Sequence, residues 1–348
     1  MDRPRLIMPE SMSRRSVLGL GAAAAAAFMV PGCSRGRSDE PAPSAPAKLA
    51  TGNLGGVYNT FGTGLAALVS EVTGMMLTPV VTAGSIDNLR KVAGGTYDVG
   101  FTTSDSAYAA YEGLGEEFGR GSLKFSALGR TYDNYVHVVV PMASKIKTLA
   151  DLGGRPVSVG PENSGTKLVA DMILKTAKNS KGKTGVDVIE KTLSLEDAAN
   201  ALNDKPKPGQ EIEAMIWSGG LPTGPIAALQ ATVGFRLLDI GEVAQTIALK
   251  QFGGYIVSSI PPKTYGLASA VPTLTIPNYL IARQTLSDSW AWWIVNTLFR
   301  RQKDLIGNPA DKEHYHPEAG ALDPRSAIAT MPVPLHQAAE RWYRNNHI

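Results

Sequence analysis

Residues 48–56 read KLATGNLGG, and this stretch decides the fold. Residues 48–51 predict a short strand, which stops at a turn of three glycines within five residues. The apolar residues that follow recur at helical spacing, namely Phe61, Leu65, Leu68, Val69 and Val72. Gly74 is a typical end for that helix. A strand, a glycine-rich turn and a helix therefore follow one another directly, as in a βα unit.

The same order repeats twice before residue 112. A strand is expected over residues 77–82, with a helix from Ser85 through Val92. A third strand over residues 98–101 precedes a helix that Ser104 opens. Three consecutive βα units predict a parallel sheet that helices cover on both faces.

A second alternating series begins after Tyr135. Residues 136–140 are apolar apart from His137 and suit a strand that crosses from one lobe to another. Further strands are expected over residues 156–159, 186–193 and 213–217, and helices over 166–177, 196–202 and 226–231. Residues 273–282 would cross back, interrupted at Pro277, before a long helix over residues 287–305.

This pattern predicts an α/β protein of two doubly wound lobes joined by two crossover strands. Residues 48–138 and 276–348 would form lobe 1, and residues 139–275 lobe 2. In open α/β sheets, ligands bind beyond the carboxyl ends of the strands. The strand-to-helix turns of both lobes are therefore expected to line a ligand cleft between them.

The N-terminus has the features of an export signal. Arg14 and Arg15 precede a short apolar run with six alanines, and the pair is similar to a twin-arginine signal. The sequence VPGC, residues 30–33, resembles a bacterial lipobox. Cys33 is the single cysteine, so it forms no internal disulfide, and lipidation would remove an exposed thiol; an incidental free thiol is the alternative. We expect an export signal over residues 1–32 and a flexible tether over residues 33–47.

The composition excludes some functions. The chain has 348 residues, a hydrophobic fraction of 43% and a net charge of +3, of which the first 32 residues carry +2. A nucleic-acid binder is expected to be more basic. No nucleophile lies in a catalytic motif, and no residues have metal-ligand spacing. We therefore expect no enzyme activity, no cofactor and no metal.

Several strand-end motifs together resemble the TAXI family of solute receptors, which serve tripartite ATP-independent (TRAP) transporters. They read TGNLGGVY at residues 51–58, GSIDNL at 84–89, SDSAY at 104–108, VSVGPENSGT at 157–166, GGLP at 219–222, and PVPLH at 332–336. The resemblance implies a periplasmic-binding-protein-like fold and an integral-membrane permease as partner. It also implies ligands such as glutamate or 2-oxoglutarate.

The candidate ligand-binding residues lie in the strand-end turns and beside the crossover. They are Gly55, Gly56, Tyr58, Ser85, Thr103, Ser104, Tyr132, Asn163, Ser164, Gly165, Thr166, Trp217, Ser218 and Gly219. The turn over residues 160–166 is a typical anion site, because it ends a strand and opens a helix. Simpler roles remain open for some of them: Ser164 and Ser85 as helix caps, Tyr58 as core packing, and Thr103 and Ser104 as a capping cluster. His137, on an apolar strand, is expected to be a core residue.

These observations predict a monomeric, lipid-anchored binding protein on the outer face of the cytoplasmic membrane or in the periplasm. It would pass a carboxylate-bearing solute to a TRAP permease. One alternative is a ligand-binding input module for a membrane sensor kinase. Another is an enzyme on the same two-lobe scaffold, which is disfavoured because no acid–base pair meets in the turns.

Overall fold

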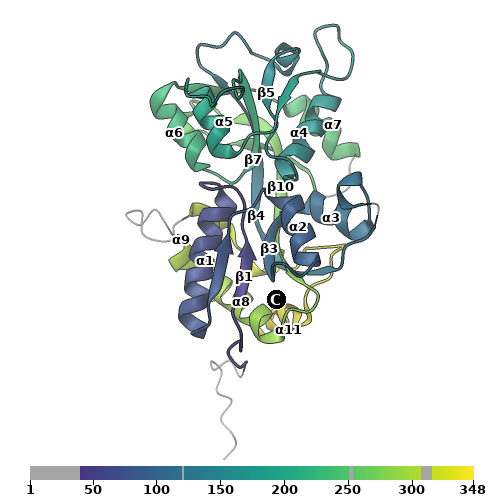
Figure 1. Cartoon of the computed structure of the whole chain (residues 1–348), viewed down its shortest axis with the longest axis vertical. Helices are drawn as coiled ribbons and strands as arrows, with labels where there is room; N and C mark the ends of the chain where they lie inside the picture. The colour runs from purple at the N-terminus through teal and green to yellow at the C-terminus, as the bar shows by residue number, and fades with distance from the viewer. Residues whose placement is uncertain (1–39, 120, 251–253, 307–315) are drawn as a thin grey trace, which may run out of the picture. The chain divides into compact units, whose positions relative to one another are not determined.

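The computed structural model describes residues 40–119, 121–250, 254–306 and 316–348. The predicted export signal and Cys33 lie outside these ranges. Residues 40–348 form one compact unit (Figure 1). Within it, two series of alternating strands and helices, joined by glycine-containing turns, contribute their strands to a single mixed sheet. This is the predicted periplasmic-binding-protein-like α/β fold.

The first half of the sheet is built from the three predicted βα units. Strands β1 (Ala47–Ala50), β2 (Leu77–Val80) and β3 (Val99–Thr103) pair in parallel in the order β2-β1-β3. Helices α1 (Val57–Thr73), α2 (Ser85–Ala93) and α3 (Ser104–Glu112) follow them in turn. Each helix therefore begins close to the carboxyl end of its strand.

The second half has the same plan. Strands β5 (Pro156–Ser158), β6 (Ile189–Lys191) and β7 (Ala214–Gly219) pair in parallel in the order β7-β5-β6. Helices α4 (Gly165–Thr176), α5 (Leu195–Leu202) and α6 (Gly224–Thr232) follow these strands. Strand β8 (Phe235–Leu237), helix α7 (Gly241–Lys250) and strand β9 (Ile256–Ile260) complete this half; the sequence patterns did not predict them.

Two long antiparallel strands join the halves. Strand β4 (Phe125–Pro141) pairs with β7 and β8, and strand β10 (Val271–Arg283) pairs with β3 and β9; β4 and β10 also pair with each other. In Figure 1 both run from one half into the other. They contain the two predicted crossovers. The precise lobe boundaries stay a prediction.

Helices cover both faces of each half. In the first half, α1, α8 (Asp288–Arg300) and α11 (Gln337–Asn345) pack on the face that carries Phe101 and Leu280, while α2 and α3 cover the face that carries Ile281. In the second half, α4 and α7 cover the face of Val138, and α5 and α6 that of Val139. Successive strand residues point to opposite faces, so neighbours in sequence enter different cores.

Three sequence-based element predictions need correction. Strand β4 begins at Phe125, eleven residues before the predicted start. The prediction missed this part because it contains the charged residues Arg130 and Asp133, which pair with each other at 2.7 Å in the folded strand. Strand β10 continues through Pro277, where its pairing with β4 shifts register. The predicted helix over residues 287–305 is divided at Arg301 into α8 and α9 (Gln302–Ile306).

The described end of the predicted tether packs on the domain. Trp290 Nε1 donates to the Ala45 carbonyl at 2.9 Å, and Trp293 Nε1 donates to the Pro41 carbonyl at 3.1 Å. Arg341 also pairs with Glu40 at 2.8 Å. Residues 40–45 therefore lie against α8 and α11. Within the described ranges, no helix is both long enough and apolar enough to cross a bilayer.

Candidate ligand-binding cavity

A cavity of about 40 Å³ lies where the strand-to-helix turns of the two halves meet. In this arrangement of the two halves it is small and has space for only a few water molecules, so a larger solute would require the halves to move apart. Its lining comes from β3, β4 and β7, from the first residues of α1, α2 and α4, and from the turns before these helices. The lining residues are Gly52, Asn53, Gly56, Val57, Tyr58, Ala83, Gly84, Ser85, Thr103, Tyr132, Asn134, Ser164, Gly165, Thr166, Trp217, Ser218 and Gly219.

Eleven of the fourteen predicted site residues are in this lining; Gly55, Ser104 and Asn163 are not. The structure also adds residues that the sequence analysis did not select, among them Asn53, Gly84 and Asn134. Asn53 and Gly84 belong to the quoted motifs at residues 51–58 and 84–89, so selecting every residue of each strand-end turn would have included them. Asn134 lies on a strand that the sequence patterns placed too late.

Four helices begin at the cavity. Their N-cap residues, Gly56 of α1, Gly84 of α2, Thr103 of α3 and Ser164 of α4, all line it. The first three caps make no side-chain hydrogen bond to the helix. The N–H groups at a helix start have no partner within the helix, and the helix dipole places partial positive charge there. Convergent helix N-termini favour an anion in the space between them.

The lining contains no charged side chain among the described residues. It does contain buried polar atoms without a hydrogen-bond partner: Tyr132 Oη, Trp217 Nε1 and Ser218 Oγ. Native proteins pair almost all such atoms, so each unpaired one needs an explanation. A ligand that accepts hydrogen bonds would supply the partners.

Tyr58 combines the two roles that the sequence left open. Its ring lines the cavity and stacks on Phe101, with 5.2 Å between ring centroids. Its hydroxyl donates to Asn278 Oδ1 at 2.5 Å. Asn278 in turn donates to Asn134 Oδ1 at 2.9 Å. The Tyr58 hydroxyl is thus engaged within the protein, and burial raises its pKa well above the ordinary value.

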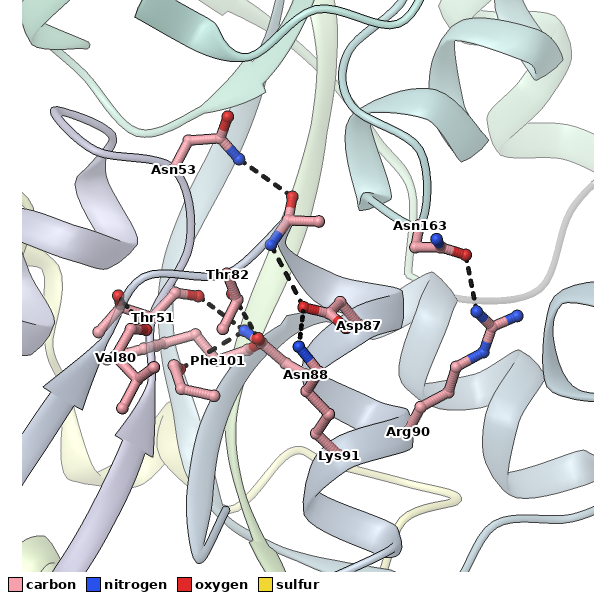
Figure 2. Close-up of polar contacts among 12 residues, drawn as sticks. Thr51, Asn53, Val80, Thr82, Asp87, Asn88, Arg90, Lys91, Phe101 and Asn163 are labelled. Atoms are coloured by element: carbon pink, nitrogen blue, oxygen red, sulfur yellow. Dashed lines mark hydrogen bonds and ion pairs between the residues drawn. The ribbon is translucent and has the colours of Figure 1, made fainter. Parts of the chain in front are cut away.

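Asn88 holds the turns of the first half in place (Figure 2). Its buried amide nitrogen donates to the carbonyls of Thr51 at 2.7 Å and Phe101 at 2.8 Å, and its oxygen accepts from Thr82 Oγ1 at 2.6 Å. It ties together the ends of β1 and β3. Neither Asn88 nor Ser85 caps α2: the N-cap is Gly84, and Ser85 Oγ accepts from the Thr103 N–H at 3.2 Å.

The turn before α4 has the predicted cap. Ser164 Oγ accepts a hydrogen bond from the Lys167 N–H at 3.1 Å, which confirms its capping role. Thr166 Oγ1 accepts from the Ser218 N–H at 3.2 Å, which joins the start of α4 to the end of β7. Gly165 lies between them, against the first half. A Cβ at this position would be 2.8 Å from Ser85 Oγ and 2.9 Å from Thr103 Oγ1.

Asn163 and Gly55 connect the two halves at the edge of the cavity. The Asn163 carbonyl accepts from the Asp87 N–H at 2.9 Å, and Asn163 Oδ1 accepts from Arg90 Nη1 at 2.7 Å (Figure 2). A Cβ at Gly55 would be 3.1 Å from Pro225 of α6. Asn53 Oδ1 accepts from the Leu195 N–H at 3.1 Å. These contacts hold the turns of one half against the other.

A second set of contacts involves buried titratable groups. Glu318 accepts a hydrogen bond from the Leu221 N–H, and His316 Nε2 lies 3.2 Å from the Pro222 carbonyl, to which it donates. Burial, with a smaller contribution from the charge of Asp133, raises the pKa of Glu318 to about 7. Burial lowers the pKa of His316 to about 4. These residues join the C-terminal segment to the loop after β7.

Asp105 lies behind the cavity, beside Ser104 at the start of α3. Its Oδ2 accepts from the Tyr255 hydroxyl at 2.6 Å, and burial raises its pKa. His137 is fully buried, with Nε2 at 3.0 Å from the Tyr265 hydroxyl, so the predicted core role is confirmed. Among the described residues, no three His, Cys, Asp or Glu side chains are grouped to hold a metal ion.

Solved structures share this architecture. One is a protein from Bordetella bronchiseptica RB50, with 18% identity and a TM-score of 0.51 over 84% of this chain and 83% of that chain. Another is the alkanesulfonate-binding protein SsuA from Xanthomonas axonopodis pv. citri bound to MOPS, with 16% identity and a TM-score of 0.46 over 87% of this chain and 84% of that chain. At 18% identity, the likeness to the Bordetella protein is a likeness of fold.

The fold is periplasmic-binding-protein-like, with two α/β halves whose strand ends meet at the cavity. The chain belongs to the NMT1-like family, whose model matches residues 49–346.

Proposed function

We propose that this protein is an exported, lipid-anchored solute-binding protein that captures a small organic acid and delivers it to a TRAP-type membrane permease. The acid is glutamate-like or 2-oxoglutarate-like in size. The observation that carries the proposal is the convergence of four helix N-termini on a cavity whose described lining has no charged side chain.

The anion preference follows from the donors around the cavity. Without an arginine or lysine in the described lining, a carboxylate would be held by backbone N–H groups at the helix starts and by hydroxyl groups. Thr166 and Ser85 supply hydroxyls beside the start of α4. Hydrogen bonds to a charged group are each worth about 1.5–3 kcal/mol, so a few of them give substantial affinity.

The partner and the location rest on the sequence and on the family. The motif resemblance to TAXI receptors implies a TRAP permease, and membership of the NMT1-like family is compatible with solute capture. The Arg14–Arg15 pair and Cys33 indicate export followed by lipid anchoring outside the cytoplasmic membrane. A reconstituted permease that imports solute only when this protein is added would support delivery.

The retained ligand tests the proposal. Protein purified without refolding is denatured, and the released small molecules are identified by mass spectrometry. We expect an organic acid of about two to six carbons at close to one equivalent per chain. A stoichiometric cation or uncharged metabolite would contradict acid capture.

A further inference from the structure

We propose that the solute is an acid that carries a second hydrogen-bond-accepting group and no ammonium group. A 2-oxo dicarboxylate such as 2-oxoglutarate meets this description, and an amino acid such as glutamate does not. The inference rests on the proposed function, acid capture in this cavity, and narrows its substrate class.

The second accepting group is inferred from three donors with no partner. Tyr132 Oη, Trp217 Nε1 and Ser218 Oγ are all buried and unpaired, and all three residues line the cavity. The residues are only 1%, 7% and 7% exposed. An indole N–H donates and never accepts, whereas a hydroxyl group can donate or accept. The Trp217 N–H therefore requires a ligand atom that accepts, and the hydroxyls of Tyr132 and Ser218 can donate to such an atom; we call Tyr132, Trp217 and Ser218 the donor cluster.

The donor cluster is separate from the helix starts. Trp217 and Ser218 lie at the end of β7 and Tyr132 lies on β4, whereas the helix starts at the cavity are those of α1 to α4. A ligand with one acid group at the helix starts would leave the donor cluster without a partner. A second carboxylate or a keto oxygen on the same ligand would pair with the donor cluster.

The cavity is unsuited to an ammonium group. An ammonium has three donors and no acceptor, so it needs accepting atoms, usually a carboxylate. No carboxylate is in the described lining, and the nearby Asp105 and Glu318 are bonded to Tyr255 and Leu221. The lining amide oxygens, Asn53 Oδ1 and Asn134 Oδ1, already accept from other groups. Partial positive charge at the starts of α1 and α4, whose first turns hold no acidic residue, also opposes a cation.

The chain offers a matched control for the donor cluster. Ser126 Oγ is equally buried and unpaired, but Ser126 is not in the cavity lining. If the fold simply tolerates unpaired buried hydroxyls, neither Ser126→Ala nor Ser218→Ala should change ligand affinity. If Ser218 contacts the ligand, only Ser218→Ala should weaken binding.

Calorimetry at fixed pH and salt tests the inference with 2-oxoglutarate, glutarate and L-glutamate. We expect 2-oxoglutarate and glutarate to bind, and L-glutamate to bind at least about 10-fold more weakly. Trp217→Phe and Ser218→Ala should each weaken 2-oxoglutarate binding by about 10- to 100-fold, the loss of one hydrogen bond to a charged group. Ser126→Ala should bind as the wild type does. Thermal melts without ligand establish that each variant is folded.

Equal binding of L-glutamate and 2-oxoglutarate would overturn the inference and leave acid capture intact. So would wild-type affinity in both Trp217→Phe and Ser218→Ala. If Trp217→Phe fails to fold, Ser218→Ala alone decides, because it removes one oxygen and leaves the backbone bond to Thr166 in place. If no acid binds, or if the diamides of these acids bind equally well, the proposed function fails together with the inference.

Discussion

Thr166 Oγ1 accepts a hydrogen bond from the backbone N–H of Ser218 across 3.2 Å, and both residues are buried. Thr166 is in the first turn of α4, and Ser218 is in the last residues of β7. One side-chain oxygen thus fixes the position of a helix start relative to the donor cluster. The two features that we assign to ligand recognition are coupled by this bond.

Thr166→Ala should destabilise the protein as well as weaken ligand binding. The Ser218 N–H would lose its acceptor in a buried environment, which costs about 1–3 kcal/mol in the free energy of unfolding. Urea denaturation without ligand measures this cost. Thr166→Ser keeps the oxygen and serves as the control. Equal stability of Thr166→Ala and the wild type would show that the bond does not matter to the fold.

Gly165→Ala should hinder closure of the two halves on a ligand. The added methyl would lie 2.8 Å from Ser85 Oγ and 2.9 Å from Thr103 Oγ1, while alanine itself is favourable in a helix. We expect 2-oxoglutarate to lower the radius of gyration of the wild type in X-ray scattering and to have a smaller effect on the variant, with affinity reduced by at least about 10-fold.

Gly121→Ala is the control for that experiment, because a Cβ at Gly121 meets no atom within 4 Å. An unchanged radius in the wild type at saturating ligand, with binding shown by calorimetry, would argue against a closing cleft. Full affinity in Gly165→Ala would argue against the close contact between α4 and the first half.

Glu318 should make stability depend on pH. Its pKa of about 7 in the folded protein exceeds the ordinary 4.5, so the folded state binds more protons between these values. This contribution to stability is complete below about pH 4.5 and is lost as the pH rises through 7; the difference corresponds to roughly 3 kcal/mol. Above pH 7, Glu318→Gln should therefore be more stable than the wild type by up to that amount.

The comparison must be made between the two proteins at each pH. His316 and His137 have pKa values lowered to about 4, so their own contribution is lost as the pH falls from about 6.5 through 4. Both proteins contain these histidines, and they cancel in the difference. Denaturation midpoints at pH 5 and pH 8 give the result. A difference that does not change with pH would refute the role of Glu318.

Much of this architecture can be predicted from the sequence because short local motifs mark where each strand and helix of a βα unit begins and ends. Glycine-rich turns such as residues 52–56 and 160–166 mark where strands end and helices begin, and these same turns line the cavity. The Ser164 cap follows from residue type and position alone. Ten of the eleven correctly predicted lining residues come from strand-end turns, and Tyr132 was selected for its place beside the crossover.

Other features depend on partners that are distant in sequence. Asn163 looks like part of the anion-binding turn, but its side chain and carbonyl are taken by Arg90 and Asp87, 73 residues or more away along the chain. The Glu318 contact with the loop after β7 spans 97 residues. Neither pairing has a local pattern. Strand β4 was similarly hidden, because charged residues within it are paired only once the strand forms.

Cys33→Ser should release the protein from the membrane without unfolding it. The prediction rests on the sequence VPGC at residues 30–33, since Cys33 lies outside the described residues. A single acyl chain gives only marginal attachment, so a diacylated cysteine is expected. Membrane fractions washed with carbonate are compared for wild type and variant. Retention of the variant on the membrane would contradict lipid anchoring.

The central claim is that the cavity binds an acid through helix N-termini and uncharged donors. Calorimetry with glutarate and 2-oxoglutarate, compared with their diamides, tests it most directly because the amides keep size and shape but remove the negative charge. The account predicts binding of the acids and affinity lower by at least about 10-fold for the diamides, the loss of one or more charge-assisted hydrogen bonds. Diamides that bind as tightly as the acids would contradict it.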